Sequence, residues 1–448
     1  MTDLSDLLIL GIGVSPEKND GVLRFEHYCN MFNLPYQILG HGKKWNGGDM
    51  EAGIGGGQKI NELLKAIESM DNKLLIVCDT FDVIPIAGID EIKLQFNRLT
   101  KQNQILFSSE IYCWPNKSLA SLYPKYESKY SYLNSGGFMG YRDDIYDLIK
   151  DGMIKDNSDD QYYFTMKYLA NPSDNNPIIL DSHCELFQTL GGSCTDIVLH
   201  KNRVYNHYTN SYPIFIHGNG PSKLYLNYLE NYIGTTALST ATQSESSVFF
   251  AVYIDSSSCD ISKIINQIKF IRHESKTVYL YDRSYSDTNK ESIELHGYIY
   301  KSNVTTYVTD DFINSNCEYY FLLEQHCYIT KPDILQHLIP LCNGYHRIIA
   351  PMLCRTKSLY SNFWGALDNK GFYKRSDDYL DLVNKKKRGL WNMPYISGAI
   401  LISKQIISNW DITQPNKYSD VDMQLCNNFR KNTLFMYVSN LEYYGYIE

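Results

Sequence analysis

The nine residues LLIVCDTFD, at positions 74–82, join an unbroken apolar run to two carboxylates. Such a run is typical of a strand that is buried on both faces of a parallel sheet. Asp79 and Asp82 follow at the carboxyl end of this strand, where open α/β sheets bind their ligands. Carboxylate oxygens at that place suit Mg²⁺ or Mn²⁺, and the spacing alone leaves a solvated turn with a helix N-cap as the alternative.

Strand and helix patterns alternate on both sides of this stretch. Residues 7–12 and 105–108 are further apolar runs, and apolar residues recur at helical spacing from Ile60 to Met70. This alternation predicts a mostly parallel sheet covered by helices. The strand at 7–12, the helix and the strand at 74–78 would then form a strand–helix–strand unit.

The second half of the chain repeats this plan. Isoleucines at helical spacing predict a helix over residues 261–271, and four apolar runs predict strands. These strands cover residues 248–254, 277–281, 319–323 and 348–352. Between the halves, residues 234–247 are small and polar, which is typical of a linker.

We therefore expect two tandem Rossmann-like α/β domains, residues 1–237 and 248–448. A short echo between NSDDQ at residues 157–161 and SDVDMQ at residues 419–424 is consistent with an internal duplication.

Composition excludes several classes of protein. The 448 residues carry 42 basic and 50 acidic side chains, a formal net charge of −8. An acidic chain has no positive field to hold a phosphate backbone, so we expect no nucleic-acid partner. The eleven cysteines are scattered without a CxxC pair, which favours neither a zinc site nor a disulfide framework.

No apolar run approaches the ~18 residues that cross a bilayer. Asp3 and Asp6 precede the first apolar run, where a signal peptide carries basic residues, and no small-residue cleavage site follows. We therefore expect a soluble protein with no membrane span and no signal peptide.

Two further segments combine glycines with a cation suited to phosphate. Gly55–Gly57 and Lys59 precede the first predicted helix, where backbone amides and a lysine attract anions, and a flexible turn is the alternative. The segment HGNGPSK, residues 217–223, offers His217 and Lys223. A lone histidine is usually structural, so His217 is a candidate site residue only because the chain also offers Asp79 and Asp82.

An acidic pair and two tryptophans complete the candidates. Asp159 and Asp160 lie in a polar loop and suit contact with a sugar hydroxyl or an acceptor, although charged runs are more often solvated. Trp114, after Glu110, and Trp45 suit stacking on a sugar or a base, or a place in the core.

Taken together, six segments resemble the glycosyltransferase domain of the procollagen lysyl hydroxylase/glycosyltransferase family, in order and in spacing. They are GGGQK (55–59), DTFD (79–82), SSEIYCWP (108–115), YLNSGGFMGY (132–141), DDQYYFT (159–165) and HGNGPSKLYLNYLENY (217–232). Three later segments resemble the accessory domain of that family: SNFWGAL (361–367), YKRSDDYLDLV (373–383) and GLWNMPYIS (389–397). The match ends where the family's oxygenase domain begins, so we expect no lysyl hydroxylation.

The resemblance implies two GT-A-type domains, the second degenerate, and a Mn²⁺-dependent retaining glucosyltransferase. It implies UDP-glucose as donor, galactosyl-hydroxylysine of collagen or a collagen-like peptide as acceptor, and glucosyl-α-1,2-galactosyl-hydroxylysine as product. Two-domain chains of this kind are similar to collagen glycosyltransferases of giant DNA viruses. This implies the host cytoplasm or a viral factory as location, with the secretory lumen as the alternative.

Carried over position by position, the resemblance also implies roles for single residues. The Mn²⁺ ligands would be Asp79, Asp82 and His217. Positions around the nucleotide and its diphosphate would be Val14, Trp45, Lys59, Phe81, Asn219, Gly220 and Lys223. The donor-sugar and acceptor pocket would include Glu110, Trp114, Asn134, Asp159 and Asp160. The metal and the lysines would stabilise the UDP leaving group, and of the two routes to retention we favour front-side attack over double displacement.

The chain departs from the family in three places. Phe81 stands where members carry tyrosine, which keeps a stacking ring and loses a hydroxyl. The aspartate run is shortened to Asp159 and Asp160. In the second half, the strand end that would carry Asp-x-Asp reads Glu324-Gln325-His326, so we expect that domain to be non-catalytic.

Two other functions stay open from the sequence. One is a hydroxylysine galactosyltransferase, and the other is a collagen-binding protein without activity. The intact acidic and histidine set in the first half argues against a decayed site.

Overall fold

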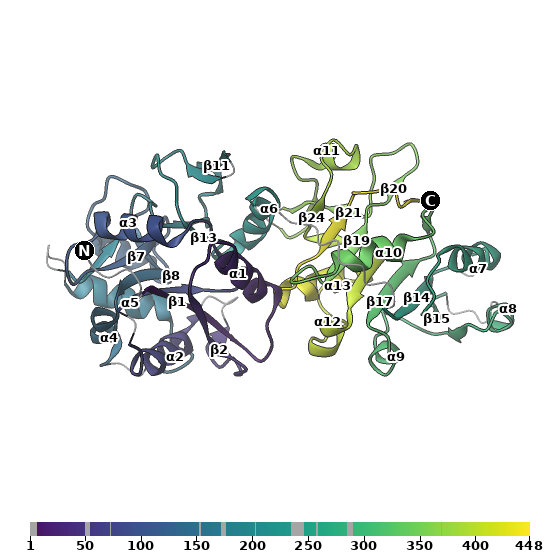
Figure 1. The fold of residues 1–448 in the computed structure, drawn as a ribbon, viewed down its shortest axis with the longest axis horizontal. Helices are drawn as coiled ribbons and strands as arrows, with labels where there is room; N and C mark the ends of the chain where they lie inside the picture. Colours follow the sequence, from purple (N-terminus) through teal and green to yellow (C-terminus); the bar gives the residue numbers. More distant parts are fainter. Residues whose placement is uncertain are drawn as a thin grey trace. The chain divides into compact units, whose positions relative to one another are not determined.

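The computed structural model divides into two compact units, Met1–Gly234 and Thr235–Glu448 (Figure 1). The structure describes residues 7–49, 54–71, 73–151, 154–171, 176–201, 203–233, 246–256, 259–284, 290–368 and 370–448. The predicted linker therefore lies almost wholly outside the described residues, as do Met1–Asp6 at the amino terminus.

A six-stranded sheet forms the centre of unit 1, in the order β2-β1-β5-β8-β7-β9. Its strands are β1 (Leu7–Ser15), β2 (Tyr36–His41), β5 (Leu74–Asp79), β7 (Ile105–Glu110), β8 (Tyr132–Tyr141) and β9 (Ile178–Leu180). The neighbours pair in parallel except at β8, which is antiparallel to β5 and β7. The predicted mostly parallel sheet is thus confirmed.

Helices cover both faces of this sheet. They are α1 (Asp20–Met31), α2 (Gly57–Ile67), α3 (Ile89–Leu99), α4 (Arg142–Ile149) and α5 (Asp160–Ala170), whereas α6 (Lys223–Ile233) packs in a separate apolar cluster with Ile84 and Ile216. Leu75 and Val77 of β5 lie in one apolar cluster with α2, α4 and α5. Ile76 and Cys78 point to the opposite face and lie in a second cluster with α1 and α3. Because successive side chains of a strand alternate between faces, the apolar run of β5 supplies both cores.

Residues 16–41 lie outside the elements that the sequence patterns predict. They form α1 and β2, so β1 has a parallel neighbour on each side, β2 and β5. The predicted helix is α2, which ends at Ile67; Met70 lies beyond it and still packs against the core.

Short strands complete unit 1. They are β3 (Gly48–Asp49), β4 (Ile54–Gly55), β6 (Val83–Pro85), β10 (Phe187–Thr189), β11 (Ile197–His200), β12 (Arg203–Asn206) and β13 (Phe215–His217). A separate small sheet has the order β10-β13-β6, in which β13 runs antiparallel to β6.

Unit 2 is built around an eight-stranded sheet, in the order β16-β15-β14-β17-β26-β19-β27-β24. These strands are β14 (Val248–Ile254), β15 (Lys276–Asp282), β16 (Ile299–Lys301), β17 (Tyr319–Glu324), β19 (Ile348–Pro351), β24 (Leu390–Asn392), β26 (Ala399–Ser403) and β27 (Tyr437–Ser439). Its helices are α7 (Ile261–Phe270), α8 (Lys290–Glu294), α9 (Asp310–Ile313), α10 (Ile334–Leu338), α11 (Tyr379–Val383), α12 (Lys404–Asn409) and α13 (Val421–Lys431). Outlying strands are β18 (Cys327–Ile329), β20 (Cys354–Arg355), β21 (Phe363–Trp364), β22 (Ala366–Leu367), β23 (Tyr373–Lys374), β25 (Tyr395–Ile396) and β28 (Gly445–Ile447).

The two large sheets share one topology. The order β15-β14-β17-β26-β19-β27 in unit 2 repeats β2-β1-β5-β8-β7-β9 in unit 1, and β26, like β8, is the antiparallel strand at its place. Asp159 caps α5 and Asp420 caps α13, each by accepting a hydrogen bond from a backbone amide. The echo in the sequence therefore falls at corresponding helix starts.

Within the described residues, every helix is too short or too polar to cross a membrane. All eleven cysteines are free thiols.

The turn after β5 is held by a close backbone contact with α1. A Cβ added to Gly21 would lie 2.4 Å from the carbonyl oxygen of Phe81 and 2.8 Å from its Cα. Neither atom belongs to a flexible side chain, so only glycine lets α1 approach the turn this closely.

Gly21→Ala is expected to lower the free energy of unfolding by roughly 1–3 kcal/mol, because the added methyl has to displace the turn. Urea unfolding monitored by circular dichroism measures the change. Gly389→Ala is the matched control, since a Cβ there would come no closer than 3.4 Å to any atom outside its chain neighbours. Equal stability of Gly21→Ala and the parent chain would contradict the proposed backbone contact.

Candidate functional site

Asp79, Asp82 and His217 form a candidate metal-binding group in the part of the chain that the structure describes. Their ligand atoms lie within 4.8 Å of one another. The Nε2 atom of His217 lies 3.5 Å from Oδ1 of Asp82 and 4.0 Å from Oδ2 of Asp79. Two carboxylate oxygens and an imidazole nitrogen fit Mn²⁺, a cation that accepts both kinds of ligand. The three residues do come together, and their role as ligands stays a prediction.

Strand pairing brings this histidine to the aspartates. Asp79 ends β5, and Asp82 precedes β6 after a two-residue turn. Because β13 pairs with β6, His217 lies opposite Val83, and the amide of Gly218 donates to the carbonyl of Asp82 at 2.8 Å. A distant segment of sequence thereby reaches the end of the central strand.

Two lysines neutralise the carboxylates. Lys59, in the first turn of α2, lies 2.8 Å from Asp79 and 3.4 Å from Asp160. Lys223, at the start of α6, lies 3.3 Å from Asp82. When a divalent ion holds the aspartates, both ammonium groups are placed to bind an anionic ligand instead.

Burial and charge shift the pKa values in this cluster. Burial raises the pKa of the Asp79 carboxyl, and Lys59 offsets only part of that effect. Burial also favours a raised pKa for Asp82, but Lys223 and His217 outweigh it, so the pKa is lowered. For His217, burial favours a lower pKa, but Asp82 outweighs it and the pKa is raised. A metal ion therefore has to displace a proton that this imidazole holds more tightly than a free histidine does.

A buried carboxylate with three amide donors lies beside the cluster. Oε1 of Glu110 accepts hydrogen bonds from Asn134 at 3.2 Å and Gln161 at 2.6 Å, and its Oε2 accepts one from Asn219 at 3.0 Å. Oδ1 of Asn134 lies 3.2 Å from Nδ1 of His217. Glu110, Asn134 and Asn219, which the sequence places in the ligand pocket, thus connect to the metal-ligand group through hydrogen bonds.

The two adjacent aspartates differ in their surroundings. Asp159 caps α5 by accepting from the amide of Tyr162 at 2.6 Å, so it has a structural role at the helix start. Asp160 faces the cluster, where Lys59 lies 3.4 Å away and the Ser135 hydroxyl donates to it at 3.3 Å. Of the two, Asp160 is therefore the better placed to act on a ligand.

The glycine-rich segment before α2 serves packing. The amides of Gly57 and Gln58 already donate at 2.8 and 2.9 Å to backbone carbonyls of the loop 156–158, so the idea that these amides bind a phosphate is wrong. A Cβ at Gly56, whose φ is +104°, would lie 2.4 Å from Asp160. The glycine therefore admits the Asp160 carboxylate.

The remaining predicted residues lie around this centre. Val14 and Trp45 pack in the apolar cluster with α2. For Trp45, a place in the core was one of the two alternatives that the sequence left open. Phe81 is half-buried in the turn between the two aspartates, and Gly220 has a φ of +57° with open space around it. The side chain of Trp114 is 44% exposed, which suits stacking.

Sequence reasoning missed Gln161, Ser135 and Gly136. Gln161 bonds to Glu110 and to the carbonyl of Trp114, and Gly136 lies against the His217 ring. The only sequence signal was their position inside DDQYYFT and YLNSGGFMGY, because hydrogen-bond partners across a site have no fixed spacing.

A family model described as PLOD GT domain matches residues 5–243, more than half of the chain. The chain belongs to this glycosyltransferase family. A second model, Glycosyltransferase family 25, N-terminal domain, matches residues 306–448. The resemblance noted in the sequence is confirmed, as is the fold class of two tandem α/β domains of glycosyltransferase type.

Relatives match the whole chain. It is 49% identical to Uncharacterized protein R699 of Acanthamoeba polyphaga mimivirus, covering 99% of this chain and 98% of the relative. It is 32% identical to Multifunctional procollagen lysine hydroxylase and glycosyltransferase of Caenorhabditis elegans, covering 100% of this chain and 66% of the relative. It is 31% identical to Multifunctional procollagen lysine hydroxylase and glycosyltransferase LH3 of Homo sapiens, covering 98% of this chain and 64% of the relative. The chain thus spans about two thirds of the length of these procollagen relatives.

Among solved structures, the chain is similar to a glycosyltransferase involved in the glycosylation of the major capsid of PBCV-1. That likeness has a TM-score of 0.33 at 14% identity, over 50% of this chain and 98% of the other.

Unit 2 carries a different set of charges at the corresponding strand end. Glu324 ends β17 as Asp79 ends β5, but its partner is Arg283, whose Nη2 lies 2.7 Å from both carboxylate oxygens. The same guanidinium binds Asp255 at 2.5 and 2.9 Å. The strand-end carboxylate therefore pairs with a guanidinium in unit 2, whereas in unit 1 it lies near a lysine and a histidine.

The Tyr307 hydroxyl lies between two carboxylates, 2.8 Å from Glu324 and 2.6 Å from Asp422. Burial raises the pKa of Glu324 to about 8 and that of Asp422 to about 7. Burial and the neighbouring carboxylates outweigh the effect of Arg283, so these two groups keep a proton close to neutral pH and titrate together.

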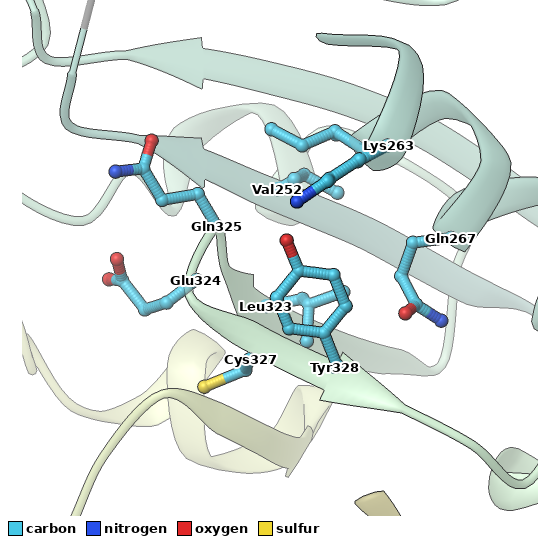
Figure 2. A pocket seen from close by; sticks show the side chains of 9 residues that line it. Val252, Lys263, Gln267, Leu323, Glu324, Gln325, Cys327 and Tyr328 are labelled. Carbon is cyan, nitrogen blue, oxygen red and sulfur yellow. The ribbon is translucent and has the colours of Figure 1, made fainter. Parts of the chain in front are cut away.

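Figure 2 shows the small pocket beside this strand end. Glu324 points away from Lys263 and Gln267, which line the opposite side of the pocket together with Tyr328. Lys263 pairs instead with Glu448, at 3.8 Å. The non-catalytic role expected for the second half stays a prediction.

Unit 2 is expected to lose stability as the pH rises from 6 to 8.5. Between its unfolded pKa of about 4 and its raised folded pKa, each carboxyl binds a proton only in the folded chain, so stability falls with rising pH until the pH passes about 7 for Asp422 and about 8 for Glu324. The slope should reach up to about 1.4 kcal/mol per pH unit for each proton released. Hydrogen exchange of peptides from β14 and β17, corrected for intrinsic rates, measures it.

Asp422→Asn should flatten this pH dependence, because the amide keeps an acceptor for Tyr307 and removes a charge beside Glu324. Asp260→Asn, a change at the cap of α7, is the control and should keep the parent slope. If Asp422→Asn kept the parent slope of stability against pH, the proton released in this range would not belong to Asp422 and Glu324.

Proposed function

We propose that this chain is a Mn²⁺-dependent retaining glucosyltransferase. It transfers glucose from UDP-glucose to galactosyl-hydroxylysine of collagen or a collagen-like peptide and forms glucosyl-α-1,2-galactosyl-hydroxylysine. The observation that carries the proposal is the group Asp79, Asp82 and His217, with Lys59 and Lys223 against it, in a chain of the PLOD glycosyltransferase family. The names of the Caenorhabditis elegans and human relatives support a procollagen acceptor.

In this proposal residues 1–237 form the catalytic domain and residues 248–448 a non-catalytic accessory domain. The guanidinium of Arg283, bound to Glu324, supports the second assignment, because it already neutralises the carboxylate that a metal would need. The mimivirus relative supports a viral source, and with it the host cytoplasm or a viral factory as location.

The donor diphosphate binds among the cations of unit 1. Asp79, Asp82 and His217 would hold Mn²⁺, and the bound ion would supply positive charge for the leaving UDP. Lys59 and Lys223 leave their aspartates and bind the diphosphate oxygens, so no cation has to be recruited from solvent as the bond breaks.

The nucleotide and sugar lie against the remaining residues. Val14, Trp45 and Phe81 border the nucleotide, and Asn219 and Gly220 border the diphosphate. The donor sugar and the acceptor lie towards Trp114, which offers an exposed ring for stacking. These assignments follow the family resemblance, and the contacts of Asn219 and the exposure of Trp114 support them.

Hydrogen bonding favours front-side attack over double displacement. A double displacement needs a carboxylate that is ready to attack the anomeric carbon. Both oxygens of Glu110 accept amide hydrogen bonds, and Asp160 accepts from the Ser135 hydroxyl and from the backbone amide of Gln161. Asp160 instead orients the acceptor hydroxyl, while Asp159 fixes the start of α5 and thereby the position of Asp160.

The purified chain with Mn²⁺ is expected to release UDP from UDP-glucose and to transfer glucose to a galactosyl-hydroxylysine peptide. Asp82→Asn should lower turnover by about 100-fold or more, because it removes a charge that holds the metal at the diphosphate. Asp90→Asn, an exposed carboxylate at the start of α3, is the matched control and should keep parent activity. No turnover with any UDP-sugar, or full activity in Asp79→Ala, would refute the proposal.

Donor and acceptor screening separates the proposal from its two rivals. UDP-galactose consumed with unmodified hydroxylysine peptide would identify a galactosyltransferase. Binding of a collagen-like peptide without consumption of any sugar nucleotide would identify a collagen-binding protein. Mass spectrometry of the peptide, with and without EDTA, detects the transferred hexose and its metal dependence.

A further inference from the structure

The ring of His217 is contacted at both of its nitrogens. Nε2 faces the carboxylates of Asp79 and Asp82, and Nδ1 lies 3.2 Å from Oδ1 of Asn134. A neutral imidazole carries its proton on one nitrogen only, so the group at Nδ1 decides whether Nε2 presents a lone pair.

The amide of Asn134 has only one orientation that satisfies its neighbours. The backbone N–H of Gly136 donates to Oδ1 at 3.1 Å, which requires the oxygen on that side. Nδ2 lies 3.2 Å from Oε1 of Glu110 and 3.3 Å from Oε1 of Gln161, and oxygens of these kinds accept from an N–H. A flipped amide would face a donor with a donor at one end and an acceptor with an acceptor at the other.

Glu110 is itself held in place by oriented donors. Its Oε2 accepts from Nδ2 of Asn219, whose Oδ1 accepts from the backbone amide of Gly191 at 2.7 Å. Glu110 and Asn134 are 5% and 4% exposed, so water does not compete for these bonds.

We propose that Glu110 and Asn134 are positioning residues that fix His217 as the tautomer protonated at Nδ1. Oδ1 of Asn134 can only accept, so Nδ1 donates to it and the lone pair of Nε2 faces the aspartates. The relay runs from the Glu110 carboxylate through the Asn134 amide to the imidazole. It rests on the proposed function in one respect, namely that Nε2 is a metal ligand.

The backbone of β8 also restrains the ring. A Cβ added to Gly136 would lie 2.2 Å from Cε1 and 2.8 Å from Nδ1 of His217, so the strand lies directly against the imidazole. Rotating the ring by half a turn would leave Oδ1 of Asn134 facing a carbon and would lose a buried hydrogen bond. Orientation and tautomer are therefore set together, as the outer partners of metal-bound histidines usually set them.

Mn²⁺ affinity and the tautomer of His217 test the relay separately. Asn134→Leu keeps the branched shape of the side chain and removes the acceptor, and it is expected to weaken Mn²⁺ binding roughly 10- to 100-fold. Titration followed by the electron paramagnetic resonance signal of free Mn²⁺ measures the affinity without donor or acceptor. ¹H–¹⁵N correlation spectra of the histidine rings, recorded without metal at a pH above the raised pKa of His217 and also with Mg²⁺, report the tautomer of the neutral ring. The parent chain should show the form protonated at Nδ1, and Asn134→Leu a mixture.

Glu110→Leu leaves Asn134 in place and removes the acceptor that orients its amide. It should also produce a tautomer mixture and a loss of Mn²⁺ affinity. Asn206→Leu is the matched control, because Asn206 is a fully buried amide with its own hydrogen bonds to Tyr130 and Gln188. It should lower stability without changing Mn²⁺ affinity or the His217 signal, which separates the relay from a general loss of packing.

Two results would overturn the relay. One is Mn²⁺ affinity in Asn134→Leu within twofold of the parent, and the other is a parent ring protonated at Nε2. Failure of the proposed function looks different. A parent chain that binds no Mn²⁺, yet shows the Nδ1-protonated ring that Asn134→Leu loses, would refute the metal assignment and support the relay.

Discussion

The pairing of β13 with β6 is the contact on which the candidate site depends. It places His217 beside the turn that carries Asp79 and Asp82, and the amide of Gly218 fixes that register on the carbonyl of Asp82. Without this short ladder, the carboxylates at the end of β5 would have no imidazole within reach. Gly21 also supports this turn, because only a glycine lets α1 approach its backbone.

Charge balance then decides what the site can hold. Buried carboxylates need counter-charges, and in unit 1 these are the ammonium groups of Lys59 and Lys223. A lysine on a flexible stem can leave one partner for another, which suits a site where a divalent ion and a diphosphate arrive together. In unit 2 the counter-charge is Arg283, whose planar guanidinium binds Glu324 and Asp255 and is fixed by both. The same sheet topology thus carries two kinds of counter-charge. In unit 1 the lysines can change partners, and in unit 2 the arginine is held by two carboxylates.

Hydrogen bonds around the ligands add direction to this charge. The NH2 group of a side-chain amide only donates hydrogen bonds and its oxygen only accepts them. In a chain of buried amides, each group therefore fixes the orientation of the next, from the backbone to the last side chain. The contacts of Glu110, Asn134 and Asn219 form such a chain, and its last member is the imidazole of His217. Asp159 and Asp160 show a similar division, since the first fixes a helix start and the second faces Lys59.

The sequence by itself determined the two α/β units and the family. Apolar runs such as residues 74–78 and the helical spacing from Ile60 are local patterns that depend only on which faces become buried. It also named Asp79, Asp82 and His217 as one group, through segments whose order and spacing resemble a known family. The tertiary structure alone decided that the amides of Gly57 and Gln58 are used up by a loop, and that Gln161 joins the network around Glu110. Such partners meet only after strands and loops have paired across long stretches of chain, and hydrogen bonding between them leaves no periodic trace in the sequence.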